Sequence, residues 1–212
     1  KRPLAMLSFS IERYLFGLDP FVMKLTNLII HIGNTCLVFA LVRRLCDIYQ
    51  ARSGPPFIVS STTFALLVAF AWAMAPINLT SVLYVVQRME GLATLAMLAG
   101  ILAYVHGRVR LADGRRGALR WLWGGVVGGI GIGFLAKESA VMVPVYTLAI
   151  EALFFGFGRH RSQERRALIK LYVWVLLIPG IAGLLYIAPR VMGPDAYSFR
   201  DFTLAERLWT QP

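Results

Sequence analysis

The sequence predicts an all-α membrane protein: a polytopic bundle of about six transmembrane helices, with short amphipathic helices on its outer face. The 212-residue chain is 58% hydrophobic and only 16% charged, which leaves too little polar surface for a soluble domain of this size. Its apolar residues come in blocks of about 20, the length that crosses a hydrocarbon core of ~30 Å. The net charge of +11 is concentrated in the gaps between these blocks, which indicates membrane topology rather than nucleic-acid binding.

The apolar blocks define the elements in chain order. Residues 1–23 mix polar and aromatic side chains, which predicts a short amphipathic helix ending near Pro20. The predicted spans follow at residues 24–45, 57–75, 91–106, 121–136, 139–157 and 171–188. The second span is expected to stop at Pro76 because proline breaks a helix, and the more polar residues 76–90 then form an interfacial helix or a loop.

Residues 1–212 are interpreted as one transmembrane domain. The chain opens at Lys1 without an initiator methionine, so we expect it to be truncated at the N-terminus, and at the C-terminus as well. The two cysteines are not expected to form a structural disulfide, since Cys36 lies within an apolar block and Cys46 near its basic end.

Arginine counting predicts the orientation of the spans. The gaps after the first, third and fifth spans lie on one side by parity and hold 13 of the 22 Lys and Arg residues. The positive-inside rule makes this side cytoplasmic. The polar segments 1–23, 76–90, 137–138 and 189–212 therefore fall together on the outer face.

One polar stripe runs along the first span. The i, i+4, i+7 spacing places Asn27, His31 and Asn34 on one helical face, and Lys24 extends this stripe one turn further outward. Such residues either hydrogen-bond to neighbouring helices or form the wall of a binding site, and the sequence leaves both interpretations open.

Charged residues at the outer membrane edge are the other candidates. Arg88 and Glu90 precede the third span, and Lys137 and Glu138 separate the fourth from the fifth. Charges at membrane depth are costly and are functional candidates by default, although a snorkelling rim pair or a charged turn would give the same pattern. Arginine and lysine suit a phosphate group, and Glu90 suits a divalent metal or an acceptor.

The glycine-rich run from Gly128 to Lys137 superficially suggests a phosphate loop. It has no glycine directly before the lysine and lies in a membrane span rather than after a strand. It therefore predicts close packing of helices through small residues. The sequence contains no zinc-ligand spacing and no Ser/His/Asp set, so no metal site is predicted from the residues themselves.

Several segments together resemble a known family. They are 2–4, 15–20, 24–28 with His31 and Asn34, 84–92, and 135–139 with Pro144 and Glu151. In order and spacing they are similar to the multi-span GT-C glycosyltransferases, and especially to the protein O-mannosyltransferase-like enzymes that often carry C-terminal tetratricopeptide repeats, bacterial relatives included. The resemblance covers most of residues 1–160.

The resemblance implies transfer of a sugar from a polyprenyl-phosphate carrier to a protein or glycan acceptor, on the periplasmic face of a bacterial inner membrane. The family's catalytic carboxylate would precede Lys1, so we expect only the full-length parent to be an enzyme. Glu90 would assist catalysis, with a divalent metal left open as a cofactor. Substrate contacts would come from Arg88, Lys137, Glu138, His31, Asn27 and Lys24, although Lys24 stands where many relatives have histidine. The alternative is a non-enzymatic transporter or flippase for a lipid-linked or anionic solute.

Overall fold

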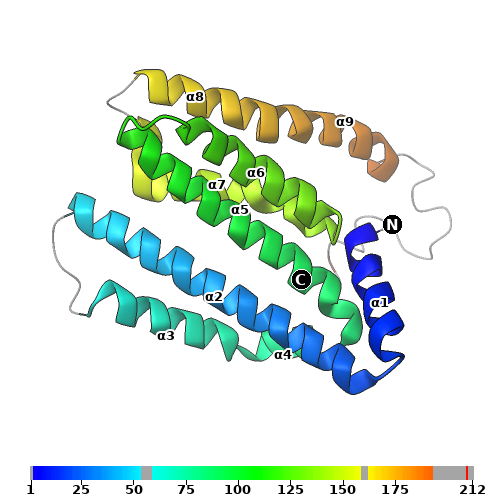
Figure 1. The fold of residues 1–212 in the computed structure, drawn as a ribbon. Helices are drawn as coiled ribbons and strands as arrows, with labels where there is room; N and C mark the ends of the chain where they lie inside the picture. The colour runs from blue at the N-terminus through cyan, green and yellow to red at the C-terminus, as the bar shows by residue number, and fades with distance from the viewer. Residues whose placement is uncertain (1, 54–58, 159–161, 193–208, 210–212) are drawn as a thin grey trace. The chain divides into compact units, whose positions relative to one another are not determined.

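The structure of the protein is a computed structural model that describes residues 2–53, 59–158, 162–192 and 209 (Figure 1). All regular structure in these residues is helical, which confirms the predicted all-α class. The chain divides into two compact units, residues 1–171 and residues 172–212.

The first unit holds the helices that matter for the site. They are α1 (Pro3–Phe16), α2 (Pro20–Ser53), α3 (Ser61–Ala73), α4 (Pro76–Leu83), α5 (Arg88–Ala112), α6 (Ala118–Phe134), α7 (Val143–Ile150) and α8 (Ser162–Tyr172). Short 3-10 turns at Val85–Gln87, Glu138–Met142 and Gly156–Gly158 and a π-helical turn at Glu151–Phe155 join them. The second unit contains a π-helical turn, Val173–Leu177, and α9 (Ile178–Met192).

Fewer helices qualify as membrane spans than the six that were expected. Within the described residues, four are long and apolar enough: Pro20–Arg52, Val85–Ala112, Glu138–Phe155 and Glu164–Tyr186. The count rises to five if α3 and α4, which bend by 62° at Pro76, form one broken span. The predicted fourth span is α6, whose 17 residues reach only about 25 Å at 1.5 Å per residue. The chain is a polytopic helical membrane protein with four to five candidate spans.

Glycines allow α5 and α6 to approach closely along their lengths (Figure 1). A Cβ atom on Gly100 would lie 2.5 Å from the carbonyl oxygen of Gly125 and 2.8 Å from the Cα of Gly129. A Cβ atom on Gly133 would lie 2.6 Å from that of Ala140. These contacts confirm that the glycine-rich run packs helices together, because only hydrogen fits at these backbone crossings.

We expect Gly100→Ala to lower the free energy of unfolding by about 1–3 kcal/mol, because the added methyl group meets backbone atoms that cannot rotate away. Gly128→Ala is the matched control, since a Cβ atom at Gly128 has nothing within 4 Å. Alanine also favours a helix over glycine by up to about 1 kcal/mol, so the control should be neutral or slightly stabilising. Denaturant titration of the full-length protein in detergent measures both, and equal effects would contradict the packing described.

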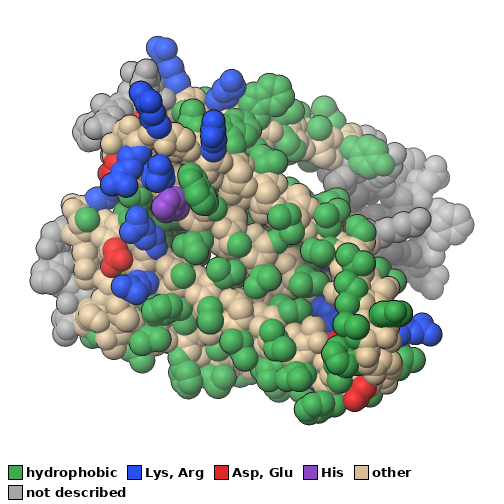
Figure 2. Space-filling model, in the orientation of Figure 1, with side chains coloured by type: hydrophobic (Ala, Val, Ile, Leu, Met, Phe, Trp, Pro, Cys, Tyr) green, Lys and Arg blue, Asp and Glu red, His purple; other side chains and the backbone are tan. Residues whose placement is uncertain are grey.

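The surface of the first unit has the character of a membrane protein. Large apolar side chains remain exposed, among them Leu66, Leu67 and Phe70 on α3, which are 55–66% exposed. Figure 2 shows Lys and Arg side chains gathered where α2 and α5 end and α8 begins, whereas hydrophobic side chains dominate the middle of this face. An apolar belt with basic residues at one end is the arrangement that a bilayer favours.

Candidate functional site

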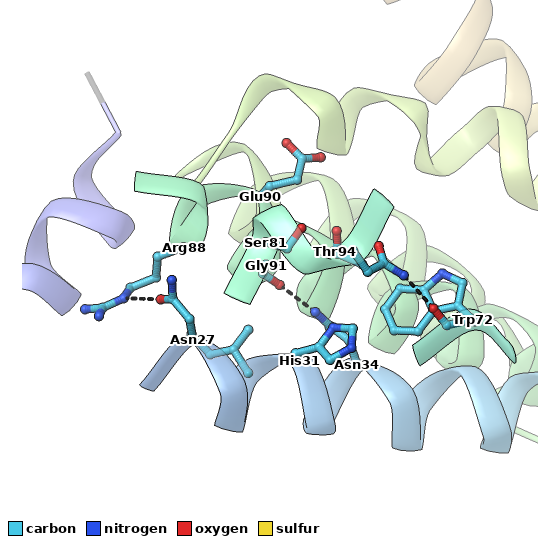
Figure 3. Close-up of a pocket in the computed structure, with 11 residues that line it drawn as sticks. Asn27, His31, Asn34, Trp72, Ser81, Arg88, Glu90, Gly91 and Thr94 are labelled. Atoms are coloured by element: carbon cyan, nitrogen blue, oxygen red, sulfur yellow. Dashed lines mark hydrogen bonds between the residues drawn. The ribbon is translucent and has the colours of Figure 1, made fainter. Parts of the chain in front are cut away.

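A polar pocket of about 270 Å³ opens between α2, α3, α4 and α5 (Figure 3). Its lining residues come from all four helices and are Asn27, Ile30, His31, Asn34, Trp72, Asn78, Ser81, Arg88, Glu90, Gly91 and Thr94. Three of the predicted substrate contacts (Asn27, His31 and Arg88) and the predicted assisting residue Glu90 are therefore brought together. The pocket exists because the bend at Pro76 turns α4 away from the line of α3.

The stripe on α2 serves both of the roles that the sequence left open. Asn27 Nδ2 donates to the Tyr84 carbonyl at 3.2 Å, and Asn34 Nδ2 donates to the Gly91 carbonyl at 3.1 Å. His31 Nε2 lies 3.2 Å from the carbonyl oxygen of Ala73, to which it donates in the tautomer protonated at that nitrogen. Each side chain thus joins α2 to another segment and also lines the pocket.

Arg88 is buried, with 1% of its surface exposed; its Nε and Nη2 atoms have partners, whereas Nη1 has no hydrogen-bond partner in the described residues. Nη2 forms an ion pair with Glu12 of α1 at 2.6 Å and donates to the Met23 carbonyl at 3.0 Å. Nε donates to Asn27 Oδ1 at 3.0 Å, and the group lies 4.4 Å from the ring centre of Phe9. The positive charge is therefore balanced within the protein, and its direct effect is to hold α1 against α2 and α5.

Glu90 leaves α5 in a different direction from Arg88 (Figure 3), as expected for residues two apart on an α-helix. Its carboxylate forms an ion pair with Lys137, in the turn after α6. Both side chains are about one-third exposed. Because exposed ion pairs are weak, either partner can be exchanged for another charged group.

The remaining predicted contacts lie outside the pocket lining. Glu138 accepts two hydrogen bonds from Arg2 Nη2, at 3.0 and 3.2 Å. Arg2 also donates through Nη1 to the sulfur of Met89 at 3.1 Å. Lys24 is exposed on α2 and does not line the pocket. The structure thus places Lys137 and Glu138 at the rim, beside Glu90 and the start of α1.

Three residues of this region were missed from the sequence. Glu12 was read as one polar residue of an amphipathic helix, although it is 5% exposed and pairs with Arg88. Trp72 stacks on His31 with ring centres 5.2 Å apart, and Asn78 donates to the Trp72 carbonyl at 2.6 Å. The available signal for Glu12 was that no Lys or Arg lies three or four positions away on its own helix, so its charge needs a partner from another segment.

A second polar cluster lies about 30 Å away, at the other end of α5, since 20 residues at 1.5 Å each separate Arg88 from Arg108. Arg108 Nε donates to both oxygens of Glu151 at 3.0 Å, and Nη1 donates to Glu164 Oε2 at 3.0 Å. Tyr104 donates to Glu151 at 2.9 Å. The sequence placed Arg108 in a loop after the third span, whereas α5 continues through it to Ala112 because two carboxylates neutralise its charge inside the bundle.

The described residues offer no group of three or more His, Cys, Asp or Glu side chains that could hold a metal ion. The Glu90 carboxylate has Lys137 as its neighbour rather than a second carboxylate or an imidazole. Among the described residues, the donor set around Glu90 therefore does not fit a divalent metal.

Comparison with known proteins identifies relatives of one kind. The chain is 25% identical to protein O-mannosyl-transferase TMTC4 of Homo sapiens, over 94% of the chain and 29% of that protein. The chain is a distant homologue of these protein O-mannosyl-transferases. It is also 26% identical to TMTC2 of Homo sapiens over 81% of the chain and 18% of that protein, and 32% identical to Tmtc3 of Drosophila melanogaster over 49% of the chain and 12% of that protein.

The homology lies mostly in the transmembrane portion of these transferases, and the chain spans less than a third of the length of the curated relatives it matches. No protein-family model matches the chain. No solved structure matches it either.

Proposed function

We propose that this chain is the membrane portion of a glycosyltransferase that moves a sugar from a polyprenyl-phosphate carrier to a protein or glycan acceptor. The observation that carries the proposal is homology to protein O-mannosyl-transferases over 94% of the chain. The arginine-rich ends of α2, α5 and the start of α8 are cytoplasmic by the positive-inside rule. The pocket and the Lys137 rim then face the periplasm of a bacterial inner membrane.

The rim suits the phosphate of a lipid carrier. Lys137 is one-third exposed at the end of two apolar helices, and its only ion-pair partner in the described residues is the equally exposed Glu90. An incoming phosphate, with more charge and more acceptor oxygens than a carboxylate, competes for the ammonium group. Lys137 then binds the phosphate, and Glu90 is released to orient the acceptor.

Transfer requires the acceptor hydroxyl to attack the anomeric carbon. The new carbon–oxygen bond forms as the bond to phosphate breaks, and the phosphate leaves with the electron pair. Lys137 stabilises the charge that develops on the phosphate. The hydroxyl proton passes to a carboxylate base, which the family resemblance assigns to the longer protein, so Glu90 has an assisting role here.

Arg88 takes a different role from the one that its sequence suggested. Its charge is already balanced by Glu12 and its guanidinium group is buried. We assign it as a positioning residue that holds α1, and with α1 the rim residue Arg2, beside the pocket. The phosphate contact is assigned to Lys137 instead.

The positions of the charges favour a transferase over a transporter. Along α5, Arg88 and Glu90 lie at one end and Arg108 and Arg110 near the other, and residues 91–107 between them carry no Asp, Glu, Lys or Arg. Transporters place their polar sites near the middle of the bilayer. A lipid-borne sugar donor instead requires its site at the membrane edge.

We expect Lys137→Ala to raise the KM for a polyprenyl-phosphate sugar by roughly 10- to 100-fold, because it removes one charge-assisted hydrogen bond to the phosphate. Glu90→Gln should leave this KM within a few-fold and lower kcat by about 100-fold. The assay uses the full-length protein in membranes with radiolabelled donor. Lys137→Arg should recover much of the donor affinity, because it restores the positive charge.

Lys170→Ala on α8 is the matched control, since Lys170 is an exposed lysine outside both polar clusters. It should leave both kinetic constants unchanged. If the Lys137→Ala protein inserts normally and transfers sugar with the wild-type KM, Lys137 does not bind the carrier phosphate.

A further inference from the structure

We propose that the pocket between α2, α3, α4 and α5 is a subsite for one neutral hexose ring. This inference rests on the proposed function, and it assigns the two parts of the donor to neighbouring places. The sugar ring occupies the pocket, while the carrier phosphate remains at Lys137 on the rim. The pocket and the rim are adjacent because Glu90 lines the pocket and pairs with Lys137.

The charges of the pocket favour a neutral ligand. Its lining includes one cation and one anion, Arg88 and Glu90. Arg88 is neutralised by the buried Glu12, and Glu90 by Lys137. With both charges balanced, the pocket offers no excess positive potential to a buried phosphate and no excess negative potential to a cation, since a buried ion requires a partner of opposite charge.

The uncharged lining offers hydrogen bonds that the protein does not use. Asn34 is 3% exposed, and its Oδ1 has no hydrogen-bond partner in the described part of the chain. The hydroxyl groups of Ser81 and Thr94 likewise form no hydrogen bond among the described residues. A buried acceptor without a partner is costly. Ligand hydroxyl groups both donate and accept, and can satisfy all three side chains.

One wall of the pocket is aromatic. The rings of His31 and Trp72 stack 5.2 Å apart at an interplanar angle of 20°, and the hydrogen bonds of His31 and Asn78 to the Ala73 and Trp72 carbonyls fix this wall in place. Aromatic rings in a pocket that is also lined by amides and hydroxyls suit a pyranose ring, which has an apolar face of C–H groups and a rim of hydroxyls. The volume of about 270 Å³ lies below the usual range for pockets of drug-sized ligands, so it suits one ring rather than an oligosaccharide.

Ser81→Ala and Thr94→Val test the subsite, because each removes one hydroxyl group without breaking a hydrogen bond seen in the structure. Binding is measured by titrating the full-length protein in nanodiscs with a short-chain polyprenyl-phosphate mannose, and separately with the same polyprenyl phosphate without sugar. We expect each variant to bind the sugar-bearing lipid roughly 2- to 10-fold more weakly and the sugar-free lipid unchanged. Lys137→Ala should weaken the binding of both lipids.

Thr62→Val is the matched control, since Thr62 is an exposed α3 threonine outside the pocket. It should change neither affinity. If Ser81→Ala and Thr94→Val weaken both lipids equally, or neither, the hexose subsite is wrong. Binding is read without turnover, so the two proposals can fail separately. The wild-type protein could transfer no sugar while Ser81→Ala and Thr94→Val weaken the binding of the sugar-bearing lipid alone. That result would support the subsite and contradict the proposed function.

Discussion

Arg108→Ala should lower the free energy of unfolding of the membrane domain by about 3–5 kcal/mol, because it removes the cation that balances two buried carboxylates. The side chains of Glu151 and Glu164 are 0% and 9% exposed, and both bind the same guanidinium group at 3.0 Å. Denaturant titration of the full-length protein in lipid nanodiscs measures the loss. Arg108→Lys should recover only part of it, since an ammonium group lacks the planar fork that contacts both acids.

The matched control for this prediction is Arg115→Ala. Arg115 pairs with Asp113 at 3.5 Å in the turn after α5, and both side chains are largely exposed, so the change should cost less than about 1 kcal/mol. A combined Arg108→Met, Glu151→Gln and Glu164→Gln variant should be more stable than Arg108→Ala, because it leaves no uncompensated charge. Equal losses for Arg108→Ala and Arg115→Ala would contradict the buried cluster.

Arg88→Ala should cost a similar amount, about 3–5 kcal/mol, and should loosen α1 in particular. Without Arg88, the Glu12 carboxylate, whose side chain is 6% exposed, keeps only the hydroxyl of Thr26 as a partner among the described residues. Hydrogen exchange should therefore rise in residues 3–16 more than in α6, whose packing against α5 through glycine does not involve Arg88.

Glu12→Gln separates a positioning role for Arg88 from direct phosphate binding. If Arg88 held the phosphate, removing its carboxylate partner would free its charge and lower the KM for the donor. As a positioning residue, Arg88 loses its anchor in Glu12→Gln, so the KM should rise and exchange in residues 3–16 should increase. A lower KM with unchanged exchange would return the phosphate contact to Arg88.

The sequence predicted where the helices lie better than how many of them span a membrane. Apolar blocks of about 20 residues mark the helices directly, and Pro76 marked the bend between α3 and α4, as the structure confirms. The described residues give four to five candidate spans rather than six, because α6, at 17 residues, is apolar like a span but short in length. Its glycines serve packing against α5, which the sequence did indicate.

The sequence predicted several residues of the candidate site but not which charged residues pair with one another. Helical spacing placed Asn27, His31 and Asn34 on one face, and they line one pocket. The partners of the charged residues were not predictable, because Arg88 and Glu12 lie on different helices and Arg108 is 43 and 56 residues from its two acids. A local sequence pattern does not predict which distant carboxylate will neutralise a given arginine.

The most direct test of the transferase proposal measures whether a radiolabelled sugar reaches an acceptor or whether its lipid carrier crosses the bilayer. Full-length protein is reconstituted in liposomes with a polyprenyl-phosphate sugar radiolabelled in the sugar, and label on protein or glycan acceptor is measured alongside labelled lipid in the opposite leaflet. We expect label to reach the acceptor, to depend on Lys137, and not to cross the bilayer. Lipid that crosses while no label reaches any acceptor would contradict the proposal and favour a flippase.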